Sequence, residues 1–450
     1  MNKVISSLRG DKVIWAIVFL LALISFLPVY SASTNLVYVI GKGSTMGYLV
    51  KHLGHLFLGF VIIFFIHKMP YHYFRALSLV GIPIVIVLLL FTLFQGTTIG
   101  GANASRWIQI PFVGISFQTS TLAFIVLMIY VARYLAKVSD KEYSFKESLL
   151  ELWLPVFAVL ALILPANFST TALIFSMVCM LVFIGYYPIK YLAFIIGAGI
   201  VSLAFFILVA KAFPDAMPNR VDTWISRVDS FMDDTPKEDA YQIEKAKIAI
   251  ASGGIKGLGP GKSVQKNFLP QSSSDFIFAI IVEEYGLVGA VGIMFLYMLL
   301  FVRFVINAQK ANSLFGKLLI IGLGFPIIFQ ALVNMSVAVE LLPVTGQTLP
   351  FLSAGGTSIW MTCLSIGIIL SVTKKDEEVA LDLEEQRKRD EALQQIIDAQ
   401  VALNVEKEAD ENQQKINSMK SSIRESLIED ENGNVLINRQ NPMNAVLNKE

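Results

Sequence analysis

The sequence predicts an all-α polytopic membrane protein with about ten transmembrane helices, and its composition and apolar patterning support this. Of its 450 residues, 55% are hydrophobic, and the mean hydropathy is +0.62. Soluble proteins reach only about 45–50% apolar residues even when glycine is counted. Apolar runs of about twenty residues, the length that spans a ~30 Å hydrocarbon core, recur before Lys375. Because lipid offers the backbone no hydrogen-bond partner, such runs are expected to be helices.

Ten apolar runs fit a membrane-spanning helix. The first follows Lys3, Arg9 and Lys12, and it is long for a signal peptide without a clear cleavage site, so we expect a retained helix. The predicted spans are 13–31, 46–66, 75–95, 118–136, 149–165, 169–187, 190–213, 276–302, 317–339 and 351–373. A large loop, 214–275, lies between the seventh and eighth spans. Such a length of chain between two spans is usually either functional or disordered, and its apolar content favours function.

The distribution of lysine and arginine between the short loops predicts the orientation. Basic residues gather at the N-terminus and in the loops 67–75, 133–148 and 303–317, whereas the loops between these contain almost no lysine or arginine. Cytoplasmic loops carry the excess of these residues. We therefore expect both termini in the cytoplasm and the large loop outside, as in a multi-pass protein of the cytoplasmic membrane.

Composition also excludes several kinds of function. The formal net charge of +1 indicates no nucleic-acid partner. Cys179 and Cys363 both lie in apolar runs, so they offer neither a disulfide framework nor a zinc site. His52 and His55 share one face of the second span, but no carboxylate accompanies them, and we expect no metal site there.

Two units are expected, a membrane domain at 1–375 and a charged cytoplasmic tail at 376–450. The first part of the tail has a helix-forming composition, and we expect disorder after about Asp430. Its apolar residues, among them Leu393 and Ile397, keep no long heptad. A solvated helix is the main interpretation, and a partner-binding coiled coil is the alternative.

The large loop changes character along its length. Its first part, 214–240, is polar and could lie along the membrane surface, and 241–251 has helical periodicity. The run GGIKGLGPGK begins at Gly253 and resembles a phosphate-binding loop, but Lys256 occupies the position of the first required glycine. A flexible loop remains, whose backbone N–H groups and lysines could meet an anion.

Three carboxylates follow the glycine-rich run. Asp275 stands where the polar segment turns apolar, and Glu283 and Glu284 lie about 12–14 Å further along a helix. Each costs at least ~2.5 kcal/mol inside a membrane. They predict a hydrated cavity in the bundle. The proline- and glycine-rich segment 343–358 predicts broken, re-entrant backbone that lines this cavity, since such backbone cannot face lipid.

Three stretches together resemble the SEDS family (shape, elongation, division and sporulation), the FtsW- and RodA-type peptidoglycan glycosyltransferases. They are the segment from Gly253 to Gly289, LLPVTGQTLPFLSAGGTS and NASRWIQI. The resemblance covers about residues 10–373 and is closer to FtsW. It implies ten transmembrane helices with a large outer loop after the seventh. It also implies polymerisation of lipid II into glycan strands at the outer face of the cytoplasmic membrane. The closer likeness to FtsW favours a role in cell division, and elongation is left open.

The resemblance assigns roles to particular residues. The essential aspartate of the family corresponds to Asp275, which would act as general base on the 4-hydroxyl of the acceptor sugar. The basic residue before the fourth helix corresponds to Arg106, which would hold the diphosphate, although an interfacial anchor is the alternative. Further candidates for substrate contact are Lys51, Lys266, Glu284, Ser353 and Ser358. Snorkelling to the interface explains Lys51 equally well.

Cofactors and partners are also implied. No covalently bound cofactor is expected, and a divalent cation, Mg²⁺ or Mn²⁺, at the diphosphate is left open. The expected partners are lipid II as substrate, a class b penicillin-binding protein (a transpeptidase), other division proteins and membrane lipids.

Three family motifs are altered in this chain. The usual Q-P-S-E-L-A-K reads QTSTLAF at 118–124, P-E-A-H-T-D reads PQSSSD at 270–275, and P-D-L-G-T reads ANFST at 166–170. These changes predict a cavity with fewer charged groups than is usual in the family.

Two other functions remain open. A lipid-linked oligosaccharide flippase would suit intramembrane Glu283 and Glu284, but transporters usually contain internal repeats, and none is found. A non-enzymatic division scaffold would act through the tail and the large loop. The variant Asp275→Asn separates these readings, because only the polymerase should lose its function.

Overall fold

The computed structural model describes residues 8–34, 41, 43–95, 107–110, 115–139, 144–212, 238–374, 376–429 and 435–437. The chain divides into two compact units, Met1–Lys375 and Asp376–Glu450.

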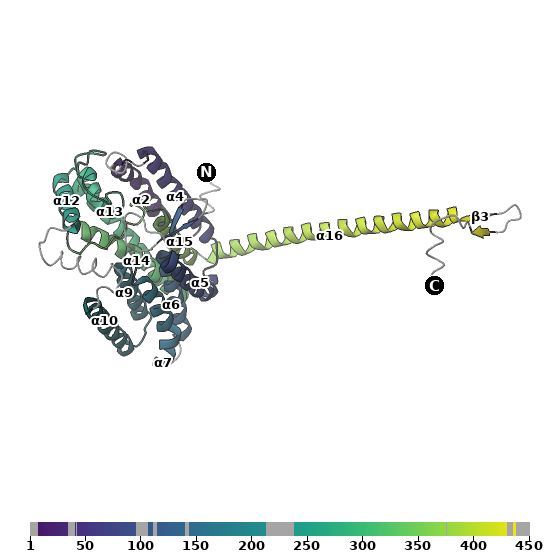
Figure 1. Ribbon diagram of the computed structural model, residues 1–450, viewed down its shortest axis with the longest axis horizontal. Helices are drawn as coiled ribbons and strands as arrows, with labels where there is room; N and C mark the ends of the chain where they lie inside the picture. The colour runs from purple at the N-terminus through teal and green to yellow at the C-terminus, as the bar shows by residue number, and fades with distance from the viewer. Residues whose placement is uncertain are drawn as a thin grey trace. The chain divides into compact units, whose positions relative to one another are not determined.

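The first unit is a bundle of apolar helices (Figure 1). Its helices are α2 (Lys12–Ala32), α4 (Thr45–Ile66), α5 (Tyr73–Gln95), α6 (Thr119–Val138), α7 (Phe145–Ser148), α8 (Leu154–Ile163), α9 (Phe168–Ile184), α10 (Ile189–Ala212), α12 (Glu238–Gly253), α13 (Ile277–Lys310), α14 (Leu314–Ala338) and α15 (Gly356–Val372). A π-helix, η1 (Leu149–Trp153), joins α7 to α8, and a 3₁₀ turn, η3 (Gln265–Asn267), follows α12. Two short strands, β1 (Trp107–Ile110) and β2 (Ile115–Gln118), form an antiparallel hairpin.

Every predicted span coincides with an apolar helical segment. Seven described helices are long and apolar enough to cross a membrane, namely α2, α4, α5, α6, α10, α13 and α14. The helices α9 and α15 are apolar but shorter, and the fifth predicted span is divided between η1 and α8. The predicted fold class is confirmed, and the number of ten crossings stays a prediction.

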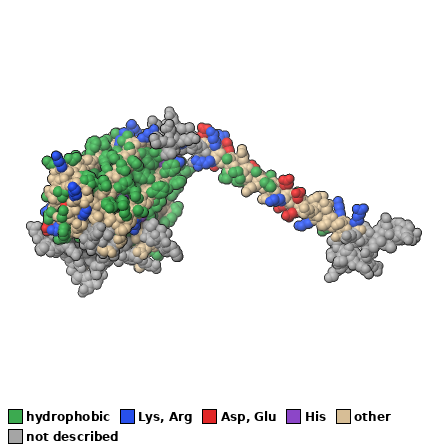
Figure 2. Space-filling view, turned by 90° about the horizontal axis from the view of Figure 1, so that it is seen from above, with side chains coloured by type: hydrophobic (Ala, Val, Ile, Leu, Met, Phe, Trp, Pro, Cys, Tyr) green, Lys and Arg blue, Asp and Glu red, His purple; other side chains and the backbone are tan. Residues whose placement is uncertain are grey.

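Hydrophobic side chains cover much of the face of this unit that Figure 2 shows. Among the most exposed are Phe57 at 73% and Phe94 at 80%. A soluble protein would bury such residues, whereas lipid accommodates them.

Inside the bundle, small residues let helices approach closely, as is usual in membranes. A Cβ atom on Gly59 of α4 would lie 2.6 Å from the Sγ atom of Cys363 in α15.

Asp11 ties three helix ends together at the end of the bundle opposite Asp275. Its carboxylate caps α2 and accepts hydrogen bonds from Arg303 and Asn307 of α13, while its own N–H donates to Thr373 Oγ1 after α15. Burial raises the pKa of Asp11, but these hydrogen bonds outweigh it and place the pKa below its usual 3.8. The pairing with Arg303 fixes α13 against the start of α2.

The helix α13 is broken at Gly286, whose φ of 66° and ψ of −166° are not helical. In an unbroken helix, the carbonyls of Glu283 and Glu284 would accept from residues four positions later. Here they accept instead from Leu258 N and Gly259 N, each at 2.9 Å. The segment Gly253–Gly261, which we term the glycine loop, therefore occupies the break.

The backbone N–H groups that follow the break also find hydrogen-bond partners in the glycine loop. Leu287 N donates to Gly254 O at 2.9 Å, and Val288 N donates to Ile255 O at 3.3 Å. A Cβ atom on Gly257 would lie 2.2 Å from Glu284 O, so only glycine permits this approach. The predicted role of the backbone N–H groups in meeting an anion is therefore wrong for Leu258 and Gly259, because α13 takes up both groups, whereas anion binding by the lysines stays a prediction.

The second unit begins with α16 (Asp376–Ser426) and ends in a pair of antiparallel strands, β3 (Leu427–Glu429) and β4 (Val435–Ile437). The helix α16 covers the segment whose composition predicts a helix and ends at Ser426, shortly before the expected limit near Asp430. The strand β4 lies where disorder was expected, while 430–434 and 438–450 lie outside the described residues. Leu393 and Ile397 are exposed at 58% and 44%, and the coiled-coil alternative stays a prediction.

Candidate active site

A cavity of about 350 Å³ lies beside Asp275 in the first unit. Its wall is built from α6, α9, α14, α15, the β1–β2 hairpin and the non-helical segments that precede α13 and α15. The volume falls in the range of small-molecule sites. Among the described lining residues, Asp275 is the only one with a charged side chain, and the polar remainder are amides and hydroxyls.

Each helix contributes one face to the cavity. On α15 the lining residues are Ser358, Met361, Thr362 and Ser365, which share one face at helical spacing. The cavity is polar around Asp275 and becomes apolar further along α6 and α14, where Met128 and Leu323 are examples of lining residues.

The main chain at Asp275 is held by α14. Asn334, which is 1% exposed, donates from Nδ2 to Asp275 O and to Gln347 O, each at 2.7 Å. One amide therefore joins the segment that carries the aspartate to the segment that precedes α15. The Oδ2 atom of Asp275 lies 3.6 Å from the position a Cβ atom would take on Gly346. The carboxylate thus lies beside backbone that has no side chain.

The two residues before Asp275 are held by the segment that precedes α15. Ala354 N donates to Ser273 O at 2.8 Å, and Ser353 Oγ donates to Ser274 O at 2.6 Å. The same Ser353 oxygen accepts from Leu349 N at 2.7 Å. Because its carbonyls at 273, 274 and 275 are all bonded, this stretch presents Asp275 in a fixed position. The prediction that 343–358 is broken backbone lining a cavity is confirmed.

Comparison with known proteins agrees with this arrangement. A family model described as "Cell cycle protein", covering FtsW, RodA and SpoVE, matches residues 11–378. The chain belongs to this FtsW/RodA/SpoVE family. Its first unit is therefore the multi-pass membrane unit of that family.

Curated relatives and solved structures extend the comparison. The chain is 30% identical to the probable peptidoglycan glycosyltransferase FtsW of Coxiella burnetii over 378 residues, 81% of this chain and 96% of the relative. It is 32% identical to the equally named protein of Geobacter sulfurreducens over 377 residues, covering 82% and 96% of the two chains.

The fold resembles a chain in a solved structure titled as a peptidoglycan synthase complex that coordinates polymerization and crosslinking. The TM-score is 0.62 at 24% identity, over 81% of this chain and 97% of that one. It also resembles the rod shape determining protein RodA of Thermus thermophilus, with a TM-score of 0.58 at 23% identity, over 81% and 96% of the chains.

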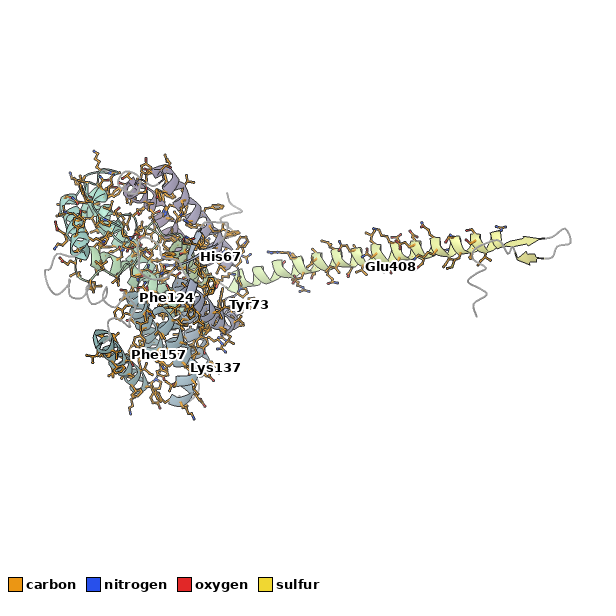
Figure 3. The ribbon with its side chains drawn as sticks, viewed as in Figure 1. His67, Tyr73, Phe124, Lys137, Phe157 and Glu408 are labelled. Carbon is orange, nitrogen blue, oxygen red and sulfur yellow. The ribbon has the colours of Figure 1, made fainter. Side chains whose placement is uncertain are left out.

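The altered FtsW/RodA motifs line the cavity. Thr121 and Phe124, which stand where the family pattern has an acid and a lysine, are both lining residues, and Figure 3 labels Phe124 on α6. Asn167, Thr170 and Gln271 from the other two altered motifs line it as well. Among the described residues, the positions of the altered motifs thus bring only uncharged side chains to the cavity, and the comparison with the usual charge of the family stays a prediction.

The predicted substrate-contact residues divide into two groups. Ser358 lines the cavity, where its Oγ atom lies 3.1 Å from Thr348 Oγ1. Ser353 is 3% exposed and does not line it, because its hydroxyl holds the main chain as described above. Arg106 lies outside the described residues, directly before Trp107, which does line the cavity.

Three other candidates lie away from the cavity lining. Lys51 is exposed on α4, and Lys266 donates to Ser31 Oγ at 3.1 Å and to Gly261 O at 2.7 Å. Glu284, 1% exposed, accepts from the same Ser31 hydroxyl. Contact of these three residues with a substrate stays a prediction.

The carboxylate of Glu283 accepts hydrogen bonds from the segment 263–265. It accepts from the Ser263 hydroxyl, from Val264 N at 3.0 Å and from Gln265 N at 3.2 Å. The cavity that the glutamates were taken to indicate exists, but Glu283 and Glu284 are not among its lining residues. Ser263 bonds to both glutamates from about twenty residues earlier in the chain: its hydroxyl donates to Glu283, and its N–H donates to Glu284 Oε1 at 3.4 Å.

The histidines of α4 have packing roles. His52 is 3% exposed and its Nε2 atom lies 2.8 Å from Ser25 Oγ, while His55 packs edge-on against Trp360. Within the described residues, no group of three or more His, Cys, Asp or Glu side chains could hold a metal ion.

The hydrogen bonds of the two amides that hold the site could not be predicted from the sequence. Asn334 and Gln330 are amides within an otherwise apolar helix, and that contrast was the available signal. Gln330 donates to Thr348 O at 2.9 Å, so both amides fasten the segment before α15. Their role appears only when distant segments are brought together.

Proposed function

We propose that the chain is a peptidoglycan glycosyltransferase that polymerises lipid II at the outer face of the cytoplasmic membrane, with Asp275 as general base. The observation that carries this proposal is that Asp275 is the only charged side chain among the described residues of the cavity, on backbone fixed from two sides. The names of the curated FtsW relatives support the choice of reaction.

The chemistry requires one base. The acceptor's 4-hydroxyl attacks the anomeric carbon of the donor, its oxygen forms the new glycosidic bond, and its proton passes to Asp275. The bond from the anomeric carbon to the lipid diphosphate breaks, and the diphosphate leaves with the electron pair. Because a diphosphate is already a good leaving group, no second carboxylate is needed to protonate it, unlike in a glycosidase. A single displacement inverts the anomeric carbon.

The leaving diphosphate requires positive charge, and the described lining of the cavity supplies none. Arg106 is the proposed cation, since a guanidinium binds phosphate oxygens in pairs and its neighbour Trp107 lines the cavity. A divalent cation fits only if the substrate helps to hold it, because the described cavity has one carboxylate, Asp275. Mg²⁺ is commonly bound in this way and would neutralise charge on the diphosphate.

The proposed setting follows the FtsW relatives and the solved synthase complex. The chain would lie in the cytoplasmic membrane with both termini inside, as the basic loops predict. It would work in cell division with a class b penicillin-binding protein, which crosslinks the strands, and with other division proteins. Support for the transpeptidase comes from the similar chain in a complex that coordinates polymerization and crosslinking.

The test is synthesis of glycan strands from purified lipid II by wild type and by Asp275→Asn, each with and without the transpeptidase. Glu340→Gln is a matched control, because Glu340 pairs with Lys247 and is not a lining residue. We expect polymer from the wild type and the control, and none from a folded Asp275→Asn.

Equal polymer from Asp275→Asn would remove this residue from the chemistry. No polymer from any sample, with the partner present, would favour translocation of the lipid-linked substrate or a scaffold role.

A further inference from the structure

The glycine loop exposes apolar side chains on the outer part of the first unit. Ile255 and Leu258 are exposed at 69% and 40%. The exposed lysines Lys256 and Lys262 lie between and beside them, and within the described residues neither ammonium group forms an ion pair or a hydrogen bond. A loop in water would expose polar residues at such positions, so these apolar side chains call for an explanation.

The loop cannot rearrange freely to bury these residues. Four backbone hydrogen bonds join it to both sides of the break in α13, as described above. At Gly257 and Gly286, a Cβ atom would lie within 2.2–2.3 Å of backbone oxygens of the opposite segment. Ile255 and Leu258 are thus held on a framework that is continuous with a membrane-spanning helix.

The depth of the break can be estimated from α13 itself. Arg303, bound to Asp11 at the start of α2, marks the end of α13 away from Asp275. The distance from Arg303 to Gly286 along the helix is about 26 Å at a rise of about 1.5 Å per residue. A hydrocarbon core is ~30 Å thick, so the break lies close to the opposite boundary between acyl chains and headgroups.

The apolar surface of the loop continues the lipid-facing surface of α13. Leu287, Val288 and Val291, just beyond the break, are exposed at 55%, 67% and 55%. Leu287 N and Val288 N bond to Gly254 O and Ile255 O, so the two surfaces are joined through the backbone. The helices α12 and α13 lie side by side at this end of the unit (Figure 1).

We propose that the glycine loop is seated in the outer leaflet of the bilayer. Ile255 and Leu258 lie at the boundary of the acyl chains, and Lys256 and Lys262 bind phosphates of phospholipid headgroups. Lysine suits this position because its stem packs on apolar surface while its ammonium reaches the headgroups. Irregular backbone is tolerated at this depth because the four groups opened in α13 are all bonded.

A glycine loop seated in the outer leaflet would hold the segment that leads to Asp275 at a fixed depth relative to the bilayer. From the loop, the chain runs through η3 to Asp275, and the carboxylate of Glu283 holds Val264 and Gln265 on the way. A substrate whose reacting group is tied to a lipid presents that group at a fixed depth. Anchoring the glycine loop in the same leaflet would place Asp275 at the depth of that reacting group. This consequence does not depend on the reaction proposed above.

The test measures depth directly with nitroxide labels on the full chain in bilayers of phosphatidylcholine and phosphatidylglycerol. Cys179 and Cys363 are replaced by alanine, and single labels are introduced by Ile255→Cys or Leu258→Cys. The control is Glu244→Cys on α12, since the Glu244 side chain is 61% exposed, similar to Ile255. We expect labels at 255 and 258 to collide more with oxygen than with a water-soluble nickel complex, and the label at 244 to show the reverse.

A second experiment tests the lysines. The double variant Lys256→Glu/Lys262→Glu should move the label at 255 toward water in bilayers that contain phosphatidylglycerol, while Lys256→Gln/Lys262→Gln should move it less. A label at 255 as accessible to nickel as that at 244 would overturn the proposal. Exposure in the bilayer followed by protection on adding the transpeptidase would also overturn it and assign the surface to that protein.

Discussion

Asn334 donates one N–H to the carbonyl of Asp275 and the other to the carbonyl of Gln347, both at 2.7 Å. A single buried amide on α14 thus sets the distance between the two non-helical segments that meet at the cavity. Neither bond involves the carboxylate itself, so Asn334 acts as a positioning residue.

Asn334→Ala should lower kcat while leaving KM nearly unchanged, because the carboxylate stays in the cavity but is no longer held in place. A misplacement of 1 Å can reduce rate by about 10²-fold. The two freed carbonyls should also destabilise the fold by about 1–3 kcal/mol each. Lipid II polymerisation kinetics and thermal unfolding in detergent check both effects.

The control for this prediction is Asn307→Ala, which removes an amide bound to Asp11 at the far end of the bundle. It should reduce stability without lowering kcat per folded molecule. An equal fall of kcat in both variants would show that Asn334 acts only through stability.

Gly257→Ala should destabilise the protein far more than Gly261→Ala. Both glycines have positive φ, 78° and 77°, so alanine strains the backbone by about 1–2 kcal/mol at either position. Only at Gly257 does the new Cβ atom meet backbone, 2.2 Å from Glu284 O, whereas nothing lies within 4 Å at Gly261. The additional overpacking should amount to about 1–3 kcal/mol. Equal unfolding temperatures for the two variants would contradict the insertion of the loop into α13.

Glu283→Gln should reduce stability by about 1–3 kcal/mol, because an amide NH₂ would then face the donors Val264 N and Gln265 N. Glu340→Gln, at an exposed ion pair with Lys247, should change it little. Hydrogen exchange of the amides at 264 and 265 would report the loosened loop. Unchanged exchange would show that the carboxylate does not hold it.

The stability contributed by Asp11 should depend on pH in the acidic range. The pKa of Asp11 is below 3.8 when folded, so the unfolded chain binds the proton more readily. The contribution is therefore fully present above the unfolded value and is lost as pH falls through the folded one. Unfolding temperatures of wild type and Asp11→Asn should differ by a constant amount at neutral pH and converge in acid. A difference that grows in acid would contradict the sign of the shift.

The helices and the re-entrant segment could be predicted because each follows from local sequence. An apolar run of about twenty residues predicts a membrane-spanning helix. The prolines and glycines of 343–358 exclude a regular helix in that segment. Asp275 could be found from its place at a polar-to-apolar boundary, together with the family resemblance.

The partners of the buried glutamates could not be found in the same way. A helix drawn through 276–302 keeps the carbonyls of Glu283 and Glu284 within its own ladder, and only the positive φ at Gly286 releases them. A single glycine in an apolar run does not reveal this break. The two acceptors of Asn334 could not be found either, because they are 59 and 13 residues away in the sequence.

The exchange of hydrogen bonds at Gly286 also constrains the order of assembly during synthesis. The glycine loop precedes α13 in the chain, and its backbone bonds to all four groups that the break opens. If it were retained on the cytoplasmic side, the outer turns of α13 would enter the bilayer with bare carbonyls and N–H groups, which lipid does not tolerate. In the orientation that the basic loops predict, the glycine loop therefore has to cross the membrane before the eighth predicted span can settle.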